Sequence, residues 1–245
     1  MILYFSGTGN SEFVAKRIAE KTGDSNVVNL GALIKKGENL SAENADKLVF
    51  VYPTYAGRMP HFLAKYLQKQ KFKEGATAFF VTTCGGSGGN QSQNLKSFCD
   101  GLHLKFMNFF FVLMPENYIA LFSAPNTEKQ KTIVNKAKLV IDSISSKIVG
   151  NVELRHITGF SKSPYNKIFY KLVVKSKGFH VLETCVGCGK CADVCVLNNI
   201  ELVKDRPHWG EVCTHCMACI NNCPTEAIQY KNATQTKRRY LFKDE

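Results

Sequence analysis

Apolar and polar residues alternate in regular blocks along the first 150 residues of the chain. Five apolar runs have the length of buried strands: 1–5, 26–30, 47–52, 76–82 and 106–114. Four intervening segments space their apolar residues as helices do: 12–19, 61–70, 91–101 and 126–148, the last capped by Asn126 or Thr127. Strands that alternate with helices predict an α/β fold with a doubly wound, five-stranded parallel sheet.

Small polar residues follow three of these strands, at the sheet edge where such folds bind ligands. The three loops are Ser6, Gly7, Thr8, Gly9, Asn10, Ser11; then Pro53, Thr54, Tyr55, Ala56, Gly57; then Thr83, Cys84, Gly85, Gly86 and Gly89. The first loop lies between a strand and a helix, which is the geometry that binds a phosphate at a helix N-terminus. The loop is not the dinucleotide-binding fingerprint, because Glu12 stands at its third glycine position. It is not a P-loop either, because no Gly-Lys-Ser/Thr follows. Taken one at a time, these loops could also be a capped turn and ordinary glycine turns.

On these three loops, residues 1–150 resemble the flavodoxin family, whose members bind FMN. The segment Ser6–Ser11 matches the family's phosphate loop, Ser/Thr-x-Thr-Gly-x-Ser/Thr. The resemblance implies that loops 53–57 and 83–89 flank the isoalloxazine ring, with Tyr55 beside it. The second of these loops lacks the aromatic residue that often stacks on the ring. The outer face of the flavin is then either open to a partner or a substrate, or covered by Tyr118 or an aromatic residue from elsewhere in the chain. A homodimer is a further implication, because flavodoxin-like folds often dimerise across the flavin.

Eight of the ten cysteines lie within one 40-residue stretch near the C-terminus. They form two motifs, Cys185-x2-Cys188-x2-Cys191-x3-Cys195 and Cys213-x2-Cys216-x2-Cys219-x3-Cys223-Pro224. In the bacterial arrangement of two [4Fe–4S] clusters, the fourth cysteine of each motif ligates the other cluster. The predicted ligand sets are Cys185, Cys188, Cys191 and Cys223 for one cluster, and Cys195, Cys213, Cys216 and Cys219 for the other. Zinc would need paired Cys-x2-Cys units, and disulfides would need an oxidising compartment, so both alternatives fit less well.

This stretch resembles the bacterial-type two-cluster ferredoxins, with one departure: Val196 stands where the first motif normally has proline. A short strand at 179–183 is expected to pair with 228–230, which makes residues 180–232 a small α+β 2[4Fe–4S] ferredoxin domain. His208 and Trp209 lie between the motifs and are expected to pack over a cluster. His215 and Met217 occupy variable positions between ligands, and no role is assigned to them.

The remaining segments are a linker and a tail. Residues 151–179 are expected to contain an amphipathic helix that starts at Ser163-Pro164 and has apolar residues at helical spacing: Tyr165, Ile168, Phe169, Leu172 and Val173. We interpret it as a connecting helix packed between domains; the alternative is a helix that binds an acidic partner or a membrane surface. Residues 233–245 form a basic tail, interpreted as a solvated end that could steer an acidic carrier.

Two cysteines lie outside the motifs. Cys99 falls on a predicted helix beside Phe98 and is expected in the core. Cys84 lies in a predicted flavin loop, where a small buried filler is favoured over a redox role of its own.

The formal net charge of the chain is +12, which raises the question of a nucleic-acid partner. No recognition motif accompanies the charge, and bound clusters and a flavin phosphate would cancel part of it, so no nucleic acid is expected. The apolar runs are much shorter than the roughly 20 residues of a membrane span. The first residues do not resemble a signal peptide, so we predict a cytoplasmic protein with reduced thiols.

Together the two halves resemble the flavodoxin–ferredoxin fusion family. The resemblance implies an electron-transfer protein with FMN and two [4Fe–4S] clusters, which converts between one-electron and two-electron carriers for a separate redox partner. The alternative is an FMN-dependent reductase of a small acceptor, such as a quinone or a nitro compound. A third class is a binding or regulatory module that depends on the basic surface. No acid–base pair or nucleophile stands out, so no catalytic residue is assigned.

Overall fold

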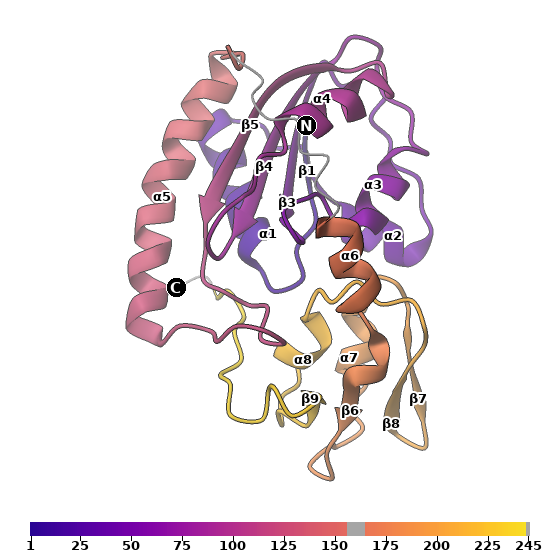
Figure 1. Ribbon diagram of the computed structural model, residues 1–245. Coiled ribbons are helices and arrows are strands. Elements are labelled where there is room, and N and C mark those ends of the chain that lie inside the picture. Colours follow the sequence, from indigo (N-terminus) through magenta and orange to yellow (C-terminus); the bar gives the residue numbers. More distant parts are fainter. Residues whose placement is uncertain (156–164, 244–245) are drawn as a thin grey trace.

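The computed structural model describes residues 1–155 and 165–243 (Figure 1). The first part of the chain contains β1 (Ile2–Tyr4), α1 (Asn10–Thr22), β2 (Val27–Asn29), α2 (Leu30–Lys36), β3 (Lys47–Pro53), α3 (His61–Leu67), β4 (Thr77–Cys84), α4 (Ser92–Asp100), β5 (Lys105–Leu113) and α5 (Thr127–Val149). The second part contains α6 (Tyr165–Leu172), β6 (Phe179–Val181), α7 (Lys190–Asp193), β7 (Ile200–Val203), β8 (Arg206–Trp209), α8 (Ala218–Asn221) and β9 (Ile228–Tyr230). No helix within these described ranges is long and apolar enough to cross a membrane.

The first part is a five-stranded parallel sheet, as predicted, and its strand order is β2-β1-β3-β4-β5. Alternate strand residues face opposite sides, because successive side chains in a strand point to opposite faces. Helices α2, α3 and α4 cover one face of the sheet, and α1 and α5 cover the other (Figure 1). Phe50 and Phe80 point to the first face, whereas Val49 and Val51 point to the second. Helix α2 was not predicted; it is only seven residues long and is capped by Asn29, whose side chain accepts a hydrogen bond from the backbone of Ala32.

The second part forms a small domain below the sheet in Figure 1. Strand β6 pairs antiparallel with β9, with Phe179 opposite Tyr230, which confirms the predicted pairing. A hairpin of β7 and β8 places Ile200 opposite Trp209 and was not predicted. Both short helices of this domain, α7 and α8, begin inside the cysteine motifs.

Helix α6 lies between the sheet and the small domain, as the connecting-helix interpretation predicted (Figure 1). Its predicted start at Ser163-Pro164 lies outside the described residues. The expected apolar face is partly wrong, because Ile168 and Leu172 are 49% and 68% exposed. The inward face instead carries Asn166, which donates hydrogen bonds to the Tyr55 and Ala56 carbonyls. Apolar spacing could not identify this face, because its central residue is polar.

The interpretation of the basic tail as a solvated end is wrong. Residues 237–242, here called the C-terminal strap, pack against both domains. Lys237 Nζ donates to the Ile119 carbonyl, and the Tyr240 hydroxyl donates to Asn10 Oδ1 at 2.7 Å. The Phe242 ring stacks on Phe13 of α1, and the Phe242 N–H donates to the Thr8 carbonyl. The strap therefore connects the small domain to the first loop of the sheet domain.

Candidate cofactor sites

Two cavities in the small domain are each lined by four cysteines. The distal cavity contains Cys185, Cys188, Cys191 and Cys223. The proximal cavity contains Cys195, Cys213, Cys216 and Cys219. Each cavity thus brings together one of the predicted ligand sets, with the fourth cysteine of each motif contributed to the other cavity; their roles as ligands remain a prediction.

The chemistry of these donors suits a cluster better than the alternatives. None of the ten cysteines forms a disulfide. No group of three His, Cys, Asp or Glu side chains in residues 1–155 and 165–243 is gathered as closely as one metal ion requires. Four thiols that surround an apolar space, and do not converge on one ion, match the sulfur ligands of an iron–sulfur cluster.

The two cysteine motifs share one backbone conformation but carry different side chains. Gly187 and Gly189 have φ angles of 66° and 75° in the first motif. His215 and Met217 occupy the equivalent positions of the second motif with φ angles of 53° and 58°. Non-glycine residues are uncommon in this left-handed region, so these two side chains are retained despite a backbone cost. Both are buried, which indicates a packing role that the sequence analysis did not assign.

The proximal cysteines are more buried than the distal cysteines and accept more hydrogen bonds from the backbone. Burial raises the pKa of the Cys216 thiol to about 12 and that of Cys213 to about 11. The backbone N–H groups of Asn199 and His215 donate to Cys195 Sγ at 3.3 Å and to Cys213 Sγ at 3.4 Å. Without a metal these thiols stay protonated at neutral pH, so metal binding there must release protons.

A third, larger cavity of about 560 Å³ lies between the sheet and the small domain. We call it the central cavity; its volume is in the range of small-molecule sites. The predicted FMN residues that line it are Asn10, Pro53, Thr54, Tyr55, Ala56, Gly57, Thr83, Cys84, Gly85 and Gly86. The predicted residues absent from its lining are Ser6, Gly7, Thr8, Gly9, Ser11 and Gly89. The loops after β3 and β4 therefore form its wall, and the first loop reaches it through Asn10.

Close contacts hold the loops after β3 and β4 together. A Cβ atom on Gly89 would lie 3.1 Å from the Gly57 carbonyl oxygen, and both glycines have positive φ angles. Gln91 Nε2 donates to Thr54 Oγ1 at 3.2 Å and to the Gly88 carbonyl. Gly89 thus supports the cavity by letting the loops approach, although it does not line it.

The first loop leaves the N-terminus of α1 without a side-chain cap. Its nearby polar side chains bond elsewhere: Asn10 Nδ2 donates to the Pro115 carbonyl, and Ser11 Oγ lies 2.7 Å from Thr83 Oγ1. The helix begins after Gly9, at a φ of 95°, and no side chain accepts from its first turn. Asn10 and Ser11 are buried, so their backbone N–H groups need a partner, and an anion is the natural one. The N–H groups of this first turn are the ones that would hold the phosphate of FMN, and Phe242 of the C-terminal strap packs beside them, against Gly9.

Aromatic side chains from outside the predicted loops complete the central cavity. They are Tyr118 and Phe122 after β5, and Phe169 and Tyr170 of α6. The Tyr170 ring stacks on His61, with centroids 3.9 Å apart and an interplanar angle of 17°. The loop after β4 has no aromatic residue to place in the wall of the cavity. Tyr118, as the sequence analysis allowed, and the aromatic residues of α6 supply aromatic side chains instead. A flat, largely apolar ring fits such a cavity.

The second cysteine motif also contributes to the central cavity. Thr214, His215 and Cys216 line both the central and the proximal cavity. His215 Nδ1 lies 3.0 Å from the Tyr118 hydroxyl, and the Lys175 N–H donates to His215 Nε2. Burial lowers the pKa of His215, so the neutral ring is favoured there. Sequence reasoning missed these three residues as cavity lining, because nothing in the motif shows which side of the loop faces the sheet.

The two lone cysteines are both buried. Cys99 is fully buried in the core between the sheet and α4, as predicted. Cys84 lines the central cavity, and burial raises the pKa of its thiol to about 11. Its thiolate, the reactive form, is therefore scarce at neutral pH.

Curated proteins and solved structures resemble different parts of the chain. The cluster region is 36% identical over 61 residues to an uncharacterized ferredoxin of Methanocaldococcus jannaschii, covering 23% of this chain and 79% of that protein. It is 34% identical over 53 residues to a ferredoxin of Methanothermococcus thermolithotrophicus, covering 20% of this chain and 88% of that protein. Among solved structures, a flavodoxin of Streptococcus pneumoniae aligns with a TM-score of 0.36 and 13% identity, over 62% of this chain and 97% of that one.

Family models match three segments of the chain. Two 4Fe-4S binding domains match residues 182–195 and 209–229, and imply two [4Fe–4S] clusters. A flavodoxin domain matches residues 1–137 and implies FMN. This combination indicates an electron-transfer flavo-iron–sulfur protein. Because the flavodoxin model covers more than half of its length, the chain belongs to the flavodoxin domain family, and it carries a two-cluster ferredoxin domain at its C-terminal end.

Proposed function

We propose that this protein carries electrons between two [4Fe–4S] clusters and FMN on behalf of a separate redox partner. In this proposal the distal and proximal cysteines hold one cluster each, and the central cavity holds FMN. When bound, the clusters exchange single electrons, whereas FMN takes up one or two. The observation that supports the proposal most is the wall formed by Thr214, His215 and Cys216, which is shared by the proximal and central cavities.

In this proposal electrons pass between the three cavities in the order distal, proximal and central. Cys188 of the distal cavity is exposed, and its neighbour Val186 is exposed as well, so a protein partner can approach there. The distal cavity shares no lining residue with the central cavity among the described residues. The proximal cysteines therefore stand between the partner's side and the flavin side. Free thiols fit the cytoplasmic location that we propose with this function.

The residues of the central cavity bind and enclose a ligand. The first turn of α1 holds the phosphate, and the loops after β3 and β4 flank the ring. Phe169 and Tyr170 add aromatic side chains to the cavity wall, which the loop after β4 does not supply. Leu121 and Phe122 of the same lining are 51% and 55% exposed, so the choice between the carrier and a reductase of small acceptors depends on experiment.

The first experiment quantifies iron, sulfide and flavin on one anaerobic sample. The proposal expects about eight irons and one FMN per chain. Eight irons without flavin would contradict the assignment of the central cavity and leave a plain ferredoxin on a flavodoxin-shaped support.

A second experiment separates the carrier from the reductase. Chemically reduced protein is mixed with increasing concentrations of a quinone or a nitro compound, and its oxidation is followed by visible absorption. A carrier gives rates that rise linearly with acceptor concentration. Saturable turnover would favour the reductase instead.

A further inference from the structure

The guanidinium of Arg239, in the C-terminal strap, lacks partners that a buried charge needs. Its Nη2 donates to the Ile228 carbonyl at 3.0 Å. Its Nε and Nη1 atoms are buried, and neither has a hydrogen-bond partner in the described part of the chain. Unpaired N–H groups on a buried cation are costly, so they normally indicate an anion that completes the site.

Arg239 lies beside the distal cavity without being part of its lining. Ile228, which accepts its hydrogen bond, lines that cavity together with Cys223. Burial lowers the pKa of Arg239, and the nearby Glu226 and Cys223 partly offset this effect. Glu226 is exposed and accepts no hydrogen bond from the guanidinium. Glu226 and the Cys223 sulfur of the distal cavity are therefore both within electrostatic reach of the guanidinium, and neither satisfies its Nε or Nη1.

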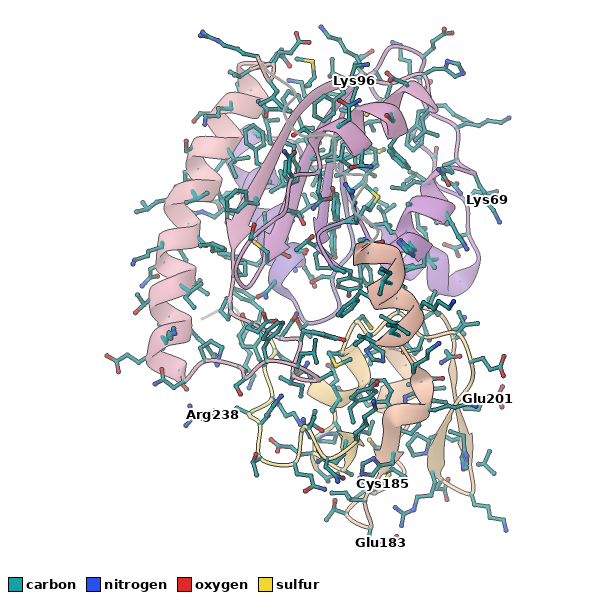
Figure 2. All side chains as sticks on the ribbon, viewed as in Figure 1. Lys69, Lys96, Glu183, Cys185, Glu201 and Arg238 are labelled. Atoms are coloured by element: carbon teal, nitrogen blue, oxygen red, sulfur yellow. The ribbon has the colours of Figure 1, made fainter. Side chains whose placement is uncertain are left out.

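The strap holds Arg239 at this position. The next residue, Tyr240, is 4% exposed, and its N–H donates to Asn221 Oδ1 at 3.0 Å. The preceding residue, Arg238, is exposed and points away from the protein in Figure 2. Two adjacent arginines therefore have different environments: Arg238 is exposed, whereas Arg239 is half-buried and bonds to the small domain through the Ile228 carbonyl.

We propose that Arg239 is the countercharge of the cluster in the distal cavity and raises the reduction potential of that cluster. The inference rests on the proposed function, because it needs a cluster at these four cysteines. A [4Fe–4S] cluster with four thiolates carries a net charge of about −2 when oxidised and gains one more negative charge on reduction. A half-buried cation nearby stabilises the reduced form more than the oxidised form. Net charge and hydrogen bonds to sulfur are two of the factors that set such potentials.

The test compares Arg239→Gln with Arg238→Gln in the full chain. An anaerobic redox titration is followed by electron paramagnetic resonance, and the distal signal is identified as the one lost in Cys188→Ser. Arg239→Gln is expected to weaken electron binding at the distal cluster about tenfold, which is a fall of about 59 mV for one electron. The proximal signal stays in place. Arg238→Gln changes neither signal, because solvent and salt screen an exposed charge.

The possible outcomes separate this inference from the proposed function. Absence of the distal signal in the unmodified protein would overturn the proposed function itself. If both signals are present and the distal cluster has the same reduction potential in Arg239→Gln and Arg238→Gln, only the role of Arg239 is overturned. If Arg239→Gln loses iron, Arg239→Lys decides: recovery of the iron content supports a role for charge, and continued loss shows that the shape of the guanidinium matters instead.

Discussion

The distal and proximal cavities are built from the same cysteine spacing, yet they differ at nearly every position between the cysteines. Val186 in the first motif is 67% exposed, whereas its counterpart Thr214 is 6% exposed. The left-handed position that follows is Gly187 in one motif and buried His215 in the other. The first motif therefore faces solvent, and the second faces the sheet domain. The ligands repeat, and the residues between them distinguish the two sites.

The residue after the fourth cysteine shows the same contrast. Pro224, which follows the family pattern, is exposed. Val196, which departs from it, is 6% exposed and belongs to the core of the sheet domain. Lys35 of α2 supports this contact, because its Nζ donates to the Ala192 carbonyl at 3.0 Å and to the Cys195 carbonyl at 3.3 Å. The missing proline thus marks the place where the two domains pack together.

Removing one cysteine from each cavity gives the largest expected effects. Cys188→Ser and Cys216→Ser are each expected to lose about four of about eight irons. Because Cys216 lines the central cavity and its carbonyl lies against Gly7, its variant is also expected to lose FMN. Iron and flavin analysis of anaerobically purified protein measures both effects.

The exposed distal cysteine serves as the matched control for this pair. Cys188→Ser should keep its FMN content, because the distal and central cavities share no lining among the described residues. Equal loss of FMN in both variants would contradict the distinction between a distal and a proximal site.

A smaller effect is expected at the residues that follow the fourth cysteines. Val196→Ala removes packing from the sheet-domain core and should cost about 2 kcal/mol. Pro224→Ala changes an exposed residue and should cost about 0.5 kcal/mol or less. For a chain of this size, the first variant should lower the anaerobic melting temperature by about 4–8 °C. Equal melting temperatures would show that Val196 does not join the domains.

Periodic patterns in the sequence predicted the regular parts of the fold. All five strands of the sheet were predicted. The apolar pattern is clearest in β3 and β4, which are buried on both faces, and weaker in the edge strands β2 and β5, which are partly exposed. The same reasoning failed for α6, whose inward face depends on Asn166 binding the loop after β3. It also failed for the tail, whose lysine and arginine side chains bond to carbonyl oxygens. The positive charge of the tail did not predict that its side chains hold it against the protein by hydrogen bonds to backbone carbonyl oxygens.

The sequence predicted those parts of the candidate sites whose residues lie close together along the chain. The cysteine spacing predicted the two sets of four that the cavities bring together, and the loops after β3 and β4 line the central cavity as expected. Thr214, His215 and Tyr170 could not be assigned, because their contribution depends on how the small domain sits against the sheet. Interdomain packing leaves no periodic signal in the sequence.

The hydrogen-bonding side chains of the two cluster cavities offer a finer comparison. Trp209 lines the proximal cavity and stacks on Phe179, and its indole N–H is directed at the Cys219 sulfur. The indole N–H is therefore a candidate donor to a cluster sulfur. Trp209→Phe keeps an aromatic ring and removes the donor, which should weaken electron binding by about 1 kcal/mol.

A redox titration measures this change at the proximal cluster. In the distal cavity, Thr225 Oγ1 lies 3.8 Å from Cys223 Sγ at an exposed position, so Thr225→Val should have a smaller effect. A larger shift in the Thr225 variant would reverse the expected order of the two cavities.

The smallest effect is expected at Cys84, which lines the central cavity but belongs to neither cysteine set. If the eight motif cysteines hold the clusters, this thiol has no redox task of its own. Burial raises its pKa to about 11, so at neutral pH it is a thiol and a poor nucleophile. Cys84→Ala should therefore leave the iron content, the FMN content and the rate of flavin reduction by a one-electron donor unchanged. Slower flavin reduction with full cofactor content would show that a ninth cysteine takes part, and the division into two cluster sites and one flavin site would then be incomplete.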